Sequence, residues 1–218
     1  QGEAATVDFG RALSFPFDDE EWPLKFIIGT LLSIVPFFAQ GYQVQVARNV
    51  VRGSKRPLPA HNQLGQVFAD GVVVVAAGVV YFLPLLVLGC IIVVPAILAG
   101  DSDLGFLLTC SATCCLFFLA FAYAIPAMML VFMGIIRYAE TGNYGEYFRL
   151  GSLVRDVRQN AGLLATLWLY TFLLAVLAAI IAPFVAVFVV GAPLLGFYYH
   201  IATGHLIGQA GQMILVGY

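Results

Sequence analysis

"GVVVVAAGVVYFLPLLVLGCIIVVPAILAG" (residues 71–100) contains no Asp, Glu, Lys or Arg. Residues 104–136 carry no charged side chain either, and none follows Arg158. Crossing the roughly 30 Å hydrocarbon core of a bilayer takes about 20 consecutive apolar residues in a helix. These stretches therefore predict several membrane spans, in a chain that is 61% hydrophobic and 10% charged.

The fold class follows from the same stretches. Soluble domains carry about a quarter charged residues, so this chain cannot cover a water-facing surface. Strands of a transmembrane barrel alternate polar and apolar residues, whereas residues 71–100 are apolar at successive positions. Because lipid offers no partner for unpaired backbone groups, we expect an all-α polytopic transmembrane helix bundle.

The short acidic turn "GDSDLG" (100–105) separates the next two predicted spans. We expect one span at about 71–99 and another at about 104–136. The stretch 162–199 has 38 residues, which would make a helix of about 57 Å, too long for one crossing. Pro183, or the later "VGAP" (190–193), is expected to break it into two spans.

The N-terminal part is predicted to hold one more span. Residues 1–23 are acidic and form an expected interfacial segment, followed by a single transmembrane helical domain over 24–218. A span at about 23–46, broken near Pro36 and Gly41, brings the total to about five. A shallow hairpin turning at Pro36 is the alternative.

Two basic loops predict the orientation. Segment 47–70 holds four of the ten Lys and Arg, and segment 137–160 holds four more. By the positive-inside rule both face the cytoplasm. Five spans then place the N-terminus outside and the C-terminus in the cytoplasm, whereas the hairpin alternative places the N-terminus inside.

The two loops also resemble each other. "RNVVRG" (48–53) matches "RYAETG" (137–142), and "LGQVFAD" (64–70) matches "LGSLVRD" (150–156). We interpret the matches as an internal repeat covering about 37–100 and 126–190. Each copy is expected to include a short amphipathic helix at the cytoplasmic surface, whose basic side chains reach lipid headgroups.

The same segments resemble a known family. The stretches "RALSFPFDDEEWPLKFIIGTLLSIVPF", "GYQVQVARNVVRGSKRPLP", "FADGVVVVAAGVVYFLP", "IRYAETGNYGEYFRLGSLVRDVRQNAG" and "GFYYHIATGHLIGQ" are similar to the domain-of-unknown-function 4013 family. The similarity covers about residues 8–211, and "LPAHNQLGQ" departs from the family's Trp- and Asp-rich turn. The resemblance implies a prokaryotic polytopic membrane protein and implies no activity.

Seven basic side chains are the candidate contact residues for lipids or an acidic partner: Arg48, Arg52, Lys55, Arg56, Arg149, Arg155 and Arg158. Lys and Arg near an anionic membrane surface contribute about 1 kcal/mol each. Charges that only set topology are the preferred interpretation, because nearly every membrane protein carries them. Nucleic acid is not an expected partner, since the net charge is −2 and no basic domain is present.

No motif indicates catalysis, so we expect no enzyme and no cofactor. The four cysteines fall in apolar spans and are interpreted as small packing residues. His200 and His205 are too far apart around a helix to share a metal, and His61 has no partner. No carboxylate falls inside a predicted span, which argues against ion coupling. Gly204 and Gly208 form a G-x-x-x-G, explained equally by packing within the bundle and by dimerisation.

We therefore expect the protein to act by binding other components of the membrane. We predict an accessory subunit or assembly factor of a larger membrane complex, in contact with membrane lipids and other membrane-protein subunits. A small permease-like or lipid-handling protein is the alternative. A pigment- or haem-associated subunit using His200 or His205 is a third, more distant hypothesis.

Overall fold

The computed structural model describes residues 6–59, 63–98, 103–188 and 190–216, and these residues form helices and no strand. Before the first long helices come α1 (Phe9–Ser14) and the 3₁₀ turn η1 (Phe15–Asp18). The remaining elements in chain order are α2 (Trp22–Ser33), α3 (Phe38–Val51), α4 (Leu64–Leu98), α5 (Asp103–Thr141), the 3₁₀ turn η3 (Tyr144–Phe148), α6 (Leu150–Gln159), α7 (Ala161–Val185) and α8 (Gly191–Val216). The predicted all-α class is confirmed.

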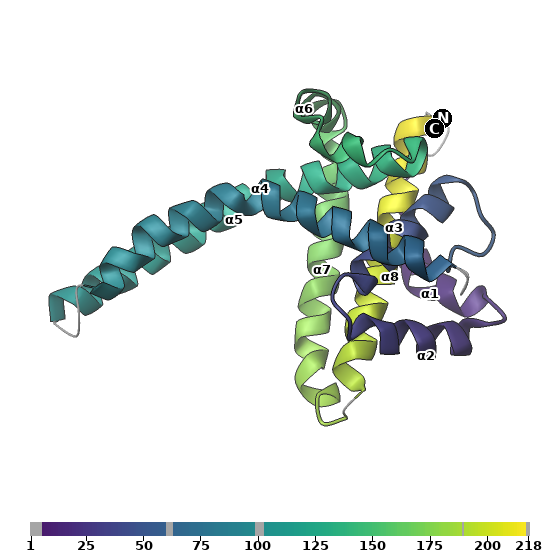
Figure 1. Cartoon of the computed structure of the whole chain (residues 1–218), viewed down its shortest axis with the longest axis horizontal. Coiled ribbons are helices and arrows are strands. Elements are labelled where there is room, and N and C mark those ends of the chain that lie inside the picture. Colours follow the sequence, from purple (N-terminus) through teal and green to yellow (C-terminus); the bar gives the residue numbers. More distant parts are fainter. Residues whose placement is uncertain (1–5, 60–62, 99–102, 189, 217–218) are drawn as a thin grey trace.

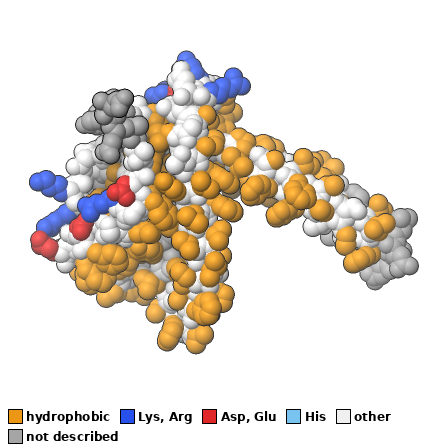
Figure 2. Space-filling model, turned by 180° about the vertical axis from the view of Figure 1, so that it is seen from behind, with side chains coloured by type: hydrophobic (Ala, Val, Ile, Leu, Met, Phe, Trp, Pro, Cys, Tyr) orange, Lys and Arg blue, Asp and Glu red, His pale blue; other side chains and the backbone are white. Residues whose placement is uncertain are grey.

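Two long helical hairpins dominate the shape. Helices α4 and α5 run side by side as an arm that projects far from the body, while α7 and α8 form a second hairpin crosswise to it (Figure 1). On the face seen in Figure 2, Lys, Arg, Asp and Glu lie on the body, while hydrophobic side chains cover the α7–α8 hairpin and much of the described part of the arm. Both apolar hairpins therefore extend from one charged region of the molecule.

Three helical segments among the described residues are long and apolar enough to cross a membrane: Leu64–Val94, Gly105–Thr141 and Ala161–Val185. This is fewer than the five spans predicted. Helix α8 has 26 residues, sufficient in length, but its histidines and glutamines lower its hydropathy. The chain thus has the helices of a membrane protein, while its orientation across the membrane stays a prediction.

The expected first span is broken in the structure. Helix α2 has 12 residues and α3 has 14, so each is only about 20 Å long and neither crosses a bilayer alone. The break falls at 34–37, as Pro36 predicted, and Phe37 adopts a left-handed conformation with φ 78°. Gly41, the other predicted break, lies inside α3 instead.

The two predicted amphipathic helices differ. The first, at 64–71, is continuous with the span and forms the first turns of α4. The second is the separate helix α6, which ends where the Asn160 side chain donates a hydrogen bond to the Asp156 carbonyl at 2.9 Å. The reason is local: apolar residues follow Asp70 directly, whereas polar Arg158, Gln159 and Asn160 separate α6 from α7.

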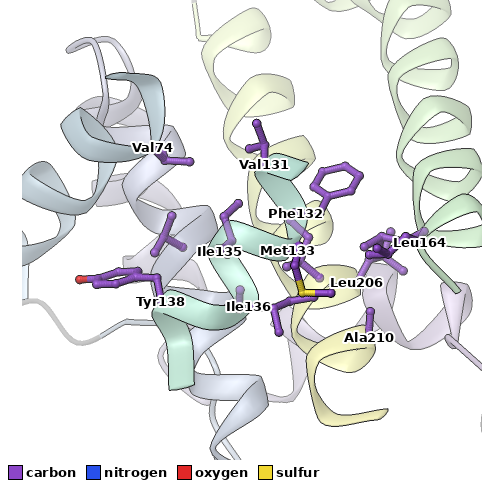
Figure 3. Packing of buried hydrophobic residues seen from close by; sticks show 14 of the residues in the cluster. Val74, Val131, Phe132, Met133, Ile135, Ile136, Tyr138, Leu164, Leu206 and Ala210 are labelled. Carbon is purple, nitrogen blue, oxygen red and sulfur yellow. The ribbon is translucent and has the colours of Figure 1, made fainter. Parts of the chain in front are cut away.

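The C-terminal half of α5 forms the centre of the core. Phe132, Met133, Ile135 and Ile136 are fully buried. They lie between Val74 of α4, Leu164 of α7 and the Leu206–Ala210 side of α8 (Figure 3). The N-terminal half of the same helix lies in the arm and is largely exposed. One helix thus joins the packed body to the projecting arm.

Glycines allow α3 and α8 to approach closely. A Cβ on Gly204 would lie 2.4 Å from the Gln43 carbonyl oxygen, and one on Gly208 would lie 2.5 Å from Val50 Cβ. Such distances leave no room for any side chain, so the G-x-x-x-G spacing serves helix packing inside this chain. Of the two alternatives for these glycines, the structure therefore supports internal packing.

The last apolar stretch and the cysteines complete the fold. Helix α7 ends at Val185 and α8 begins at Gly191, so the break lies between Pro183 and the "AP" of "VGAP". The four free cysteines are exposed on the arm, which contradicts their interpretation as packing residues. A thiol is apolar enough to face lipid, so exposure here carries no penalty.

Candidate functional site

A buried carboxylate lies at the root of the arm. Asp70 of α4 is 1% exposed. It accepts hydrogen bonds from Gln45 Nε2 at 2.5 Å, Gln66 Nε2 at 2.8 Å, the Tyr138 hydroxyl at 2.5 Å and the Tyr144 hydroxyl at 3.1 Å. These donors come from α3, α4, α5 and η3. We call this group, with Arg48, the Asp70 centre.

Arg48 balances the charge of this centre. Its Nη1 lies 3.8 Å from Asp70 Oδ2, and its guanidinium carbon lies 4.5 Å from the centroid of the Tyr138 ring. The Arg48 side chain is only 12% exposed. An unpaired charge at such a site would be strongly unfavourable, so Arg48 and Asp70 each make the burial of the other tolerable.

The Asp70 centre is chemically occupied. A carboxylate offers about four lone-pair positions, and the Asp70 carboxylate accepts four hydrogen bonds, with Arg48 in addition 3.8 Å from Oδ2. Little is left for a substrate or an ion. The centre links α3 to both helices of the arm, and these links fix the direction of the arm relative to α3.

A second arginine–aspartate pair links α5 to α6. Arg137 donates from Nε at 3.0 Å and from Nη2 at 2.6 Å to Asp156 Oδ2. In the matched loop motifs Arg137 corresponds to Arg48 and Asp156 to Asp70. The two motif copies therefore make the same ion pair, and their glycines Gly53 and Gly142 share φ 70°. The repeat itself stays a prediction.

The other predicted contact residues lie near the surface. Arg52, Lys55 and Arg158 are exposed. Arg56 pairs with Glu20 at 2.8 Å and Arg149 with Glu146 at 2.6 Å. Arg155 is 4.0 Å from Asp156. Arg48, buried in the Asp70 centre, is thus the one of the seven that is enclosed by protein.

Both histidines of α8 bind glutamines. His200 Nδ1 lies 2.9 Å from Gln43 Oε1, and His205 Nδ1 lies 2.9 Å from Gln209 Nε2. His205 also stacks on Phe15, with ring centroids 4.3 Å apart. No group of three metal-ligating side chains occurs among the described residues, and His61 lies outside them.

A second buried ion pair lies at the start of α2. Lys25 Nζ donates to Asp19 Oδ2 at 2.6 Å, and Asp19 is almost fully buried. Burial by itself raises the pKa of the Asp19 carboxyl. The hydrogen bonds from Lys25 and from the Glu21 backbone outweigh it, so the net pKa lies below the ordinary value of 3.8.

An apolar groove of about 730 Å³ opens between α2 and the turn joining α7 to α8. Its walls include Trp22, Phe26 and Ile27 on one side and Leu194 and Tyr198 on the other. The buried Thr30 hydroxyl, which lines it, has no hydrogen-bond partner among the described residues. The groove is therefore almost wholly apolar, and the Thr30 hydroxyl is an unpartnered polar atom in its wall.

Sequence reasoning missed Asp70 as a site residue. The second span was predicted to begin at residue 71, which left this carboxylate in a loop, but α4 begins at Leu64. A candidate span therefore does contain a carboxylate, contrary to expectation. Two signals pointed to it: its place in the repeat motif, and the unusual polarity of Gln45 in an apolar segment.

The family relationship can be stated at this point. A family model described as "Protein of unknown function (DUF4013)" matches residues 28–192. The chain belongs to this family. The DUF4013 match includes both arginine–aspartate pairs and leaves Asp19 and Lys25 outside it. Comparisons with curated proteins and with solved structures give no significant match.

Proposed function

We propose that this DUF4013 protein acts through contacts within the membrane, as an accessory subunit or assembly factor of a larger membrane complex. The observation that carries the proposal is the α4–α5 arm, which extends away from the body with apolar side chains on its surface (Figures 1 and 2). An arm of two helices buries little of its own surface. In the most apolar 18-residue stretch of α4, only 11% of the residues are buried.

The surface of the arm has the composition of a contact surface. Phe117 and Phe118 of α5 are 65% and 66% exposed, and Phe106 is exposed to a similar degree. Aromatic side chains are enriched where proteins meet. At the other end, the Asp70 centre fastens the arm to α3, so these rings are presented in a fixed direction. An occupied carboxylate and an arm with exposed apolar side chains suit binding better than catalysis.

Co-purification from native membranes in a mild detergent tests the proposal. We expect a stoichiometric membrane-protein partner, identified by mass spectrometry, that is lost when Phe117 and Phe118 are both changed to Ala. The matched control is Phe184→Ala with Phe188→Ala, two exposed rings of which one lies in the last turn of α7 and the other just after it. A monodisperse chain without a partner would overturn the proposal, as would equal loss in both variants.

The apolar groove supports a second candidate, a lipid-handling protein. A cleft of about 730 Å³ with apolar walls suits a lipid acyl chain. Transfer of a fluorescent phospholipid between the leaflets of proteoliposomes is the readout. Ile27→Trp, which fills the groove, should slow transfer, whereas Ile34→Trp, outside the groove, should not. Transfer no faster than in protein-free vesicles would remove this candidate.

A further inference from the structure

Helix α6 has one apolar face, which the body covers only in part. At about 100° per residue, Leu153, Asp156 and Val157 share one side, and the structure shows Leu153 and Asp156 buried and Val157 partly buried against the body. Leu150 and Val154 continue this apolar face beyond Val157, at the edge that the body leaves exposed. The helix is thus held to the protein by one part of its apolar face and keeps an apolar stripe, Leu150 and Val154, uncovered.

Arginines border this uncovered stripe. On the same angular scale Arg158 lies next to Val154, and Arg155 lies beyond it. Both are exposed, Arg155 at 69% of its side chain. An exposed apolar stripe beside cationic side chains is the arrangement of a helix lying at a membrane surface, with arginine reaching the headgroups.

The position of α6 fits the same environment. A turn at Asn160 joins it directly to α7, one of the three candidate spans. It lies at the end of α7 far from the α7–α8 turn (Figure 1), where basic side chains gather above the hydrophobic surface (Figure 2). A helix attached to the end of a span is held where hydrocarbon gives way to water.

Each motif copy leaves basic side chains open. In the first copy Arg48 is paired with Asp70 and Arg56 binds Glu20 at 2.8 Å, while Arg52 and Lys55 are exposed but have, in the described part of the chain, no exposed apolar stripe of a short surface helix beside them. In the second copy Asp156 is engaged by Arg137 at 2.6 Å and lies 4.0 Å from Arg155. Among the described residues, no carboxylate pairs with Arg158 within 4.0 Å. Arg155 and Arg158 therefore keep donors available for an outside anion.

We propose that α6 binds the phosphate headgroups of anionic phospholipids through Arg155 and Arg158, with Leu150 and Val154 at the acyl-chain boundary. The charge of the helix is complementary to such lipids, and its exposed apolar stripe suits their chains. Arg149 has a smaller part, because Glu146 holds it at 2.6 Å. This site does not depend on the function proposed above, since α6 lies apart from the arm surface.

Lipid titration of the purified full chain tests the site. Phosphatidylglycerol or phosphatidylcholine is added in neutral detergent, and bound lipid is counted by native mass spectrometry. We expect phosphatidylglycerol to bind more tightly, and the double variant Arg155→Gln/Arg158→Gln to bind it about 25-fold more weakly. The matched control, Arg52→Gln/Lys55→Gln, removes the same charge from exposed positions of the first loop and should bind as the unaltered chain does.

Two further measurements separate the outcomes. Inorganic phosphate at the same concentrations should not compete, because it lacks the chains that contact Leu150 and Val154; competition would overturn a lipid site. Melting temperatures of both variants should stay unchanged, since all four side chains are exposed. Equal loss in the two variants, or no preference for phosphatidylglycerol, would also overturn the proposal.

Discussion

The Tyr138 hydroxyl on α5 donates a hydrogen bond of 2.5 Å to Asp70 on α4, across 68 residues of sequence. The bond lies where the arm meets the body, and the same carboxylate holds α3 through Gln45. Three helices that are separate in the chain thus share one buried anion. Hydrogen bonds to charged groups are stronger than those between neutral groups, which makes this point a main determinant of the arm's position.

Removing the anion should strongly destabilise the fold. Asp70→Ala leaves Arg48 buried without its partner, and breaking such a pair costs about 3–5 kcal/mol. Tyr138→Phe removes one charged hydrogen bond and should cost about 1.5–3 kcal/mol. Thermal unfolding in detergent measures both. Tyr170→Phe is the control, as its hydroxyl has no hydrogen bond among the described residues, and it should melt as the unaltered chain does.

The Arg137–Asp156 pair should contribute less to the free energy of unfolding than the Arg48–Asp70 pair. The Arg137 side chain is 33% exposed, against 12% for Arg48, so water solvates its charge once the carboxylate is gone. We expect Asp156→Ala to cost less free energy of unfolding than Asp70→Ala, by about 1–2 kcal/mol. The two variants are compared in the same unfolding assay. A larger loss for Asp156→Ala would show that α6 is fastened more firmly than the arm.

Helix packing at α8 predicts opposite effects at two glycines. Gly208→Ala places a Cβ 2.5 Å from Val50 Cβ and should separate α3 from α8, at a cost of about 1–3 kcal/mol. Gly196→Ala on the same helix meets no atom within 4 Å and should stabilise the chain by up to about 1 kcal/mol. Melting temperatures distinguish the two, and a neutral Gly208→Ala would contradict the close approach.

Acid should weaken the attachment of α2. The pKa of Asp19 in the folded chain lies below its ordinary value of 3.8. Folding therefore favours the carboxylate, so its stabilisation is fully present above the unfolded pKa and is lost as pH falls through the folded pKa. Melting temperatures should drop below about pH 4 in the unaltered chain, and less steeply in Asp19→Asn. Asp18→Asn, an exposed neighbour, should keep the steep drop.

Cysteine labelling tests the threading. In a background where the four arm cysteines are changed to Ala, Lys55→Cys and Gln159→Cys should both react with a membrane-impermeant maleimide from the cytoplasmic side. Labelling of the two positions from opposite compartments would contradict the predicted topology. The native arm cysteines, exposed on apolar helices, should react with a lipid-soluble maleimide and resist the impermeant one.

The sequence by itself determined the environment and the elements of this protein. Uncharged runs such as 71–100 indicate a lipid environment. In hydrocarbon these runs must form helices, because unpaired backbone groups are too costly there. Pro36 located the break between α2 and α3, and the polar residues 158–160 separate α6 from α7. These features follow from residues close together in the chain, which is why they were predictable.

Tertiary structure decided how the polar side chains are used. Arg48 and Arg158 look alike in the sequence, yet one is buried beside Asp70 and the other is exposed. The projection of the arm had no local pattern, and the G-x-x-x-G spacing predicted a close helix contact at Gly204 without indicating that α3 makes it. The physical reason is that the partner of a buried charge or a close glycine comes from another helix. Only packing determines which helix that is.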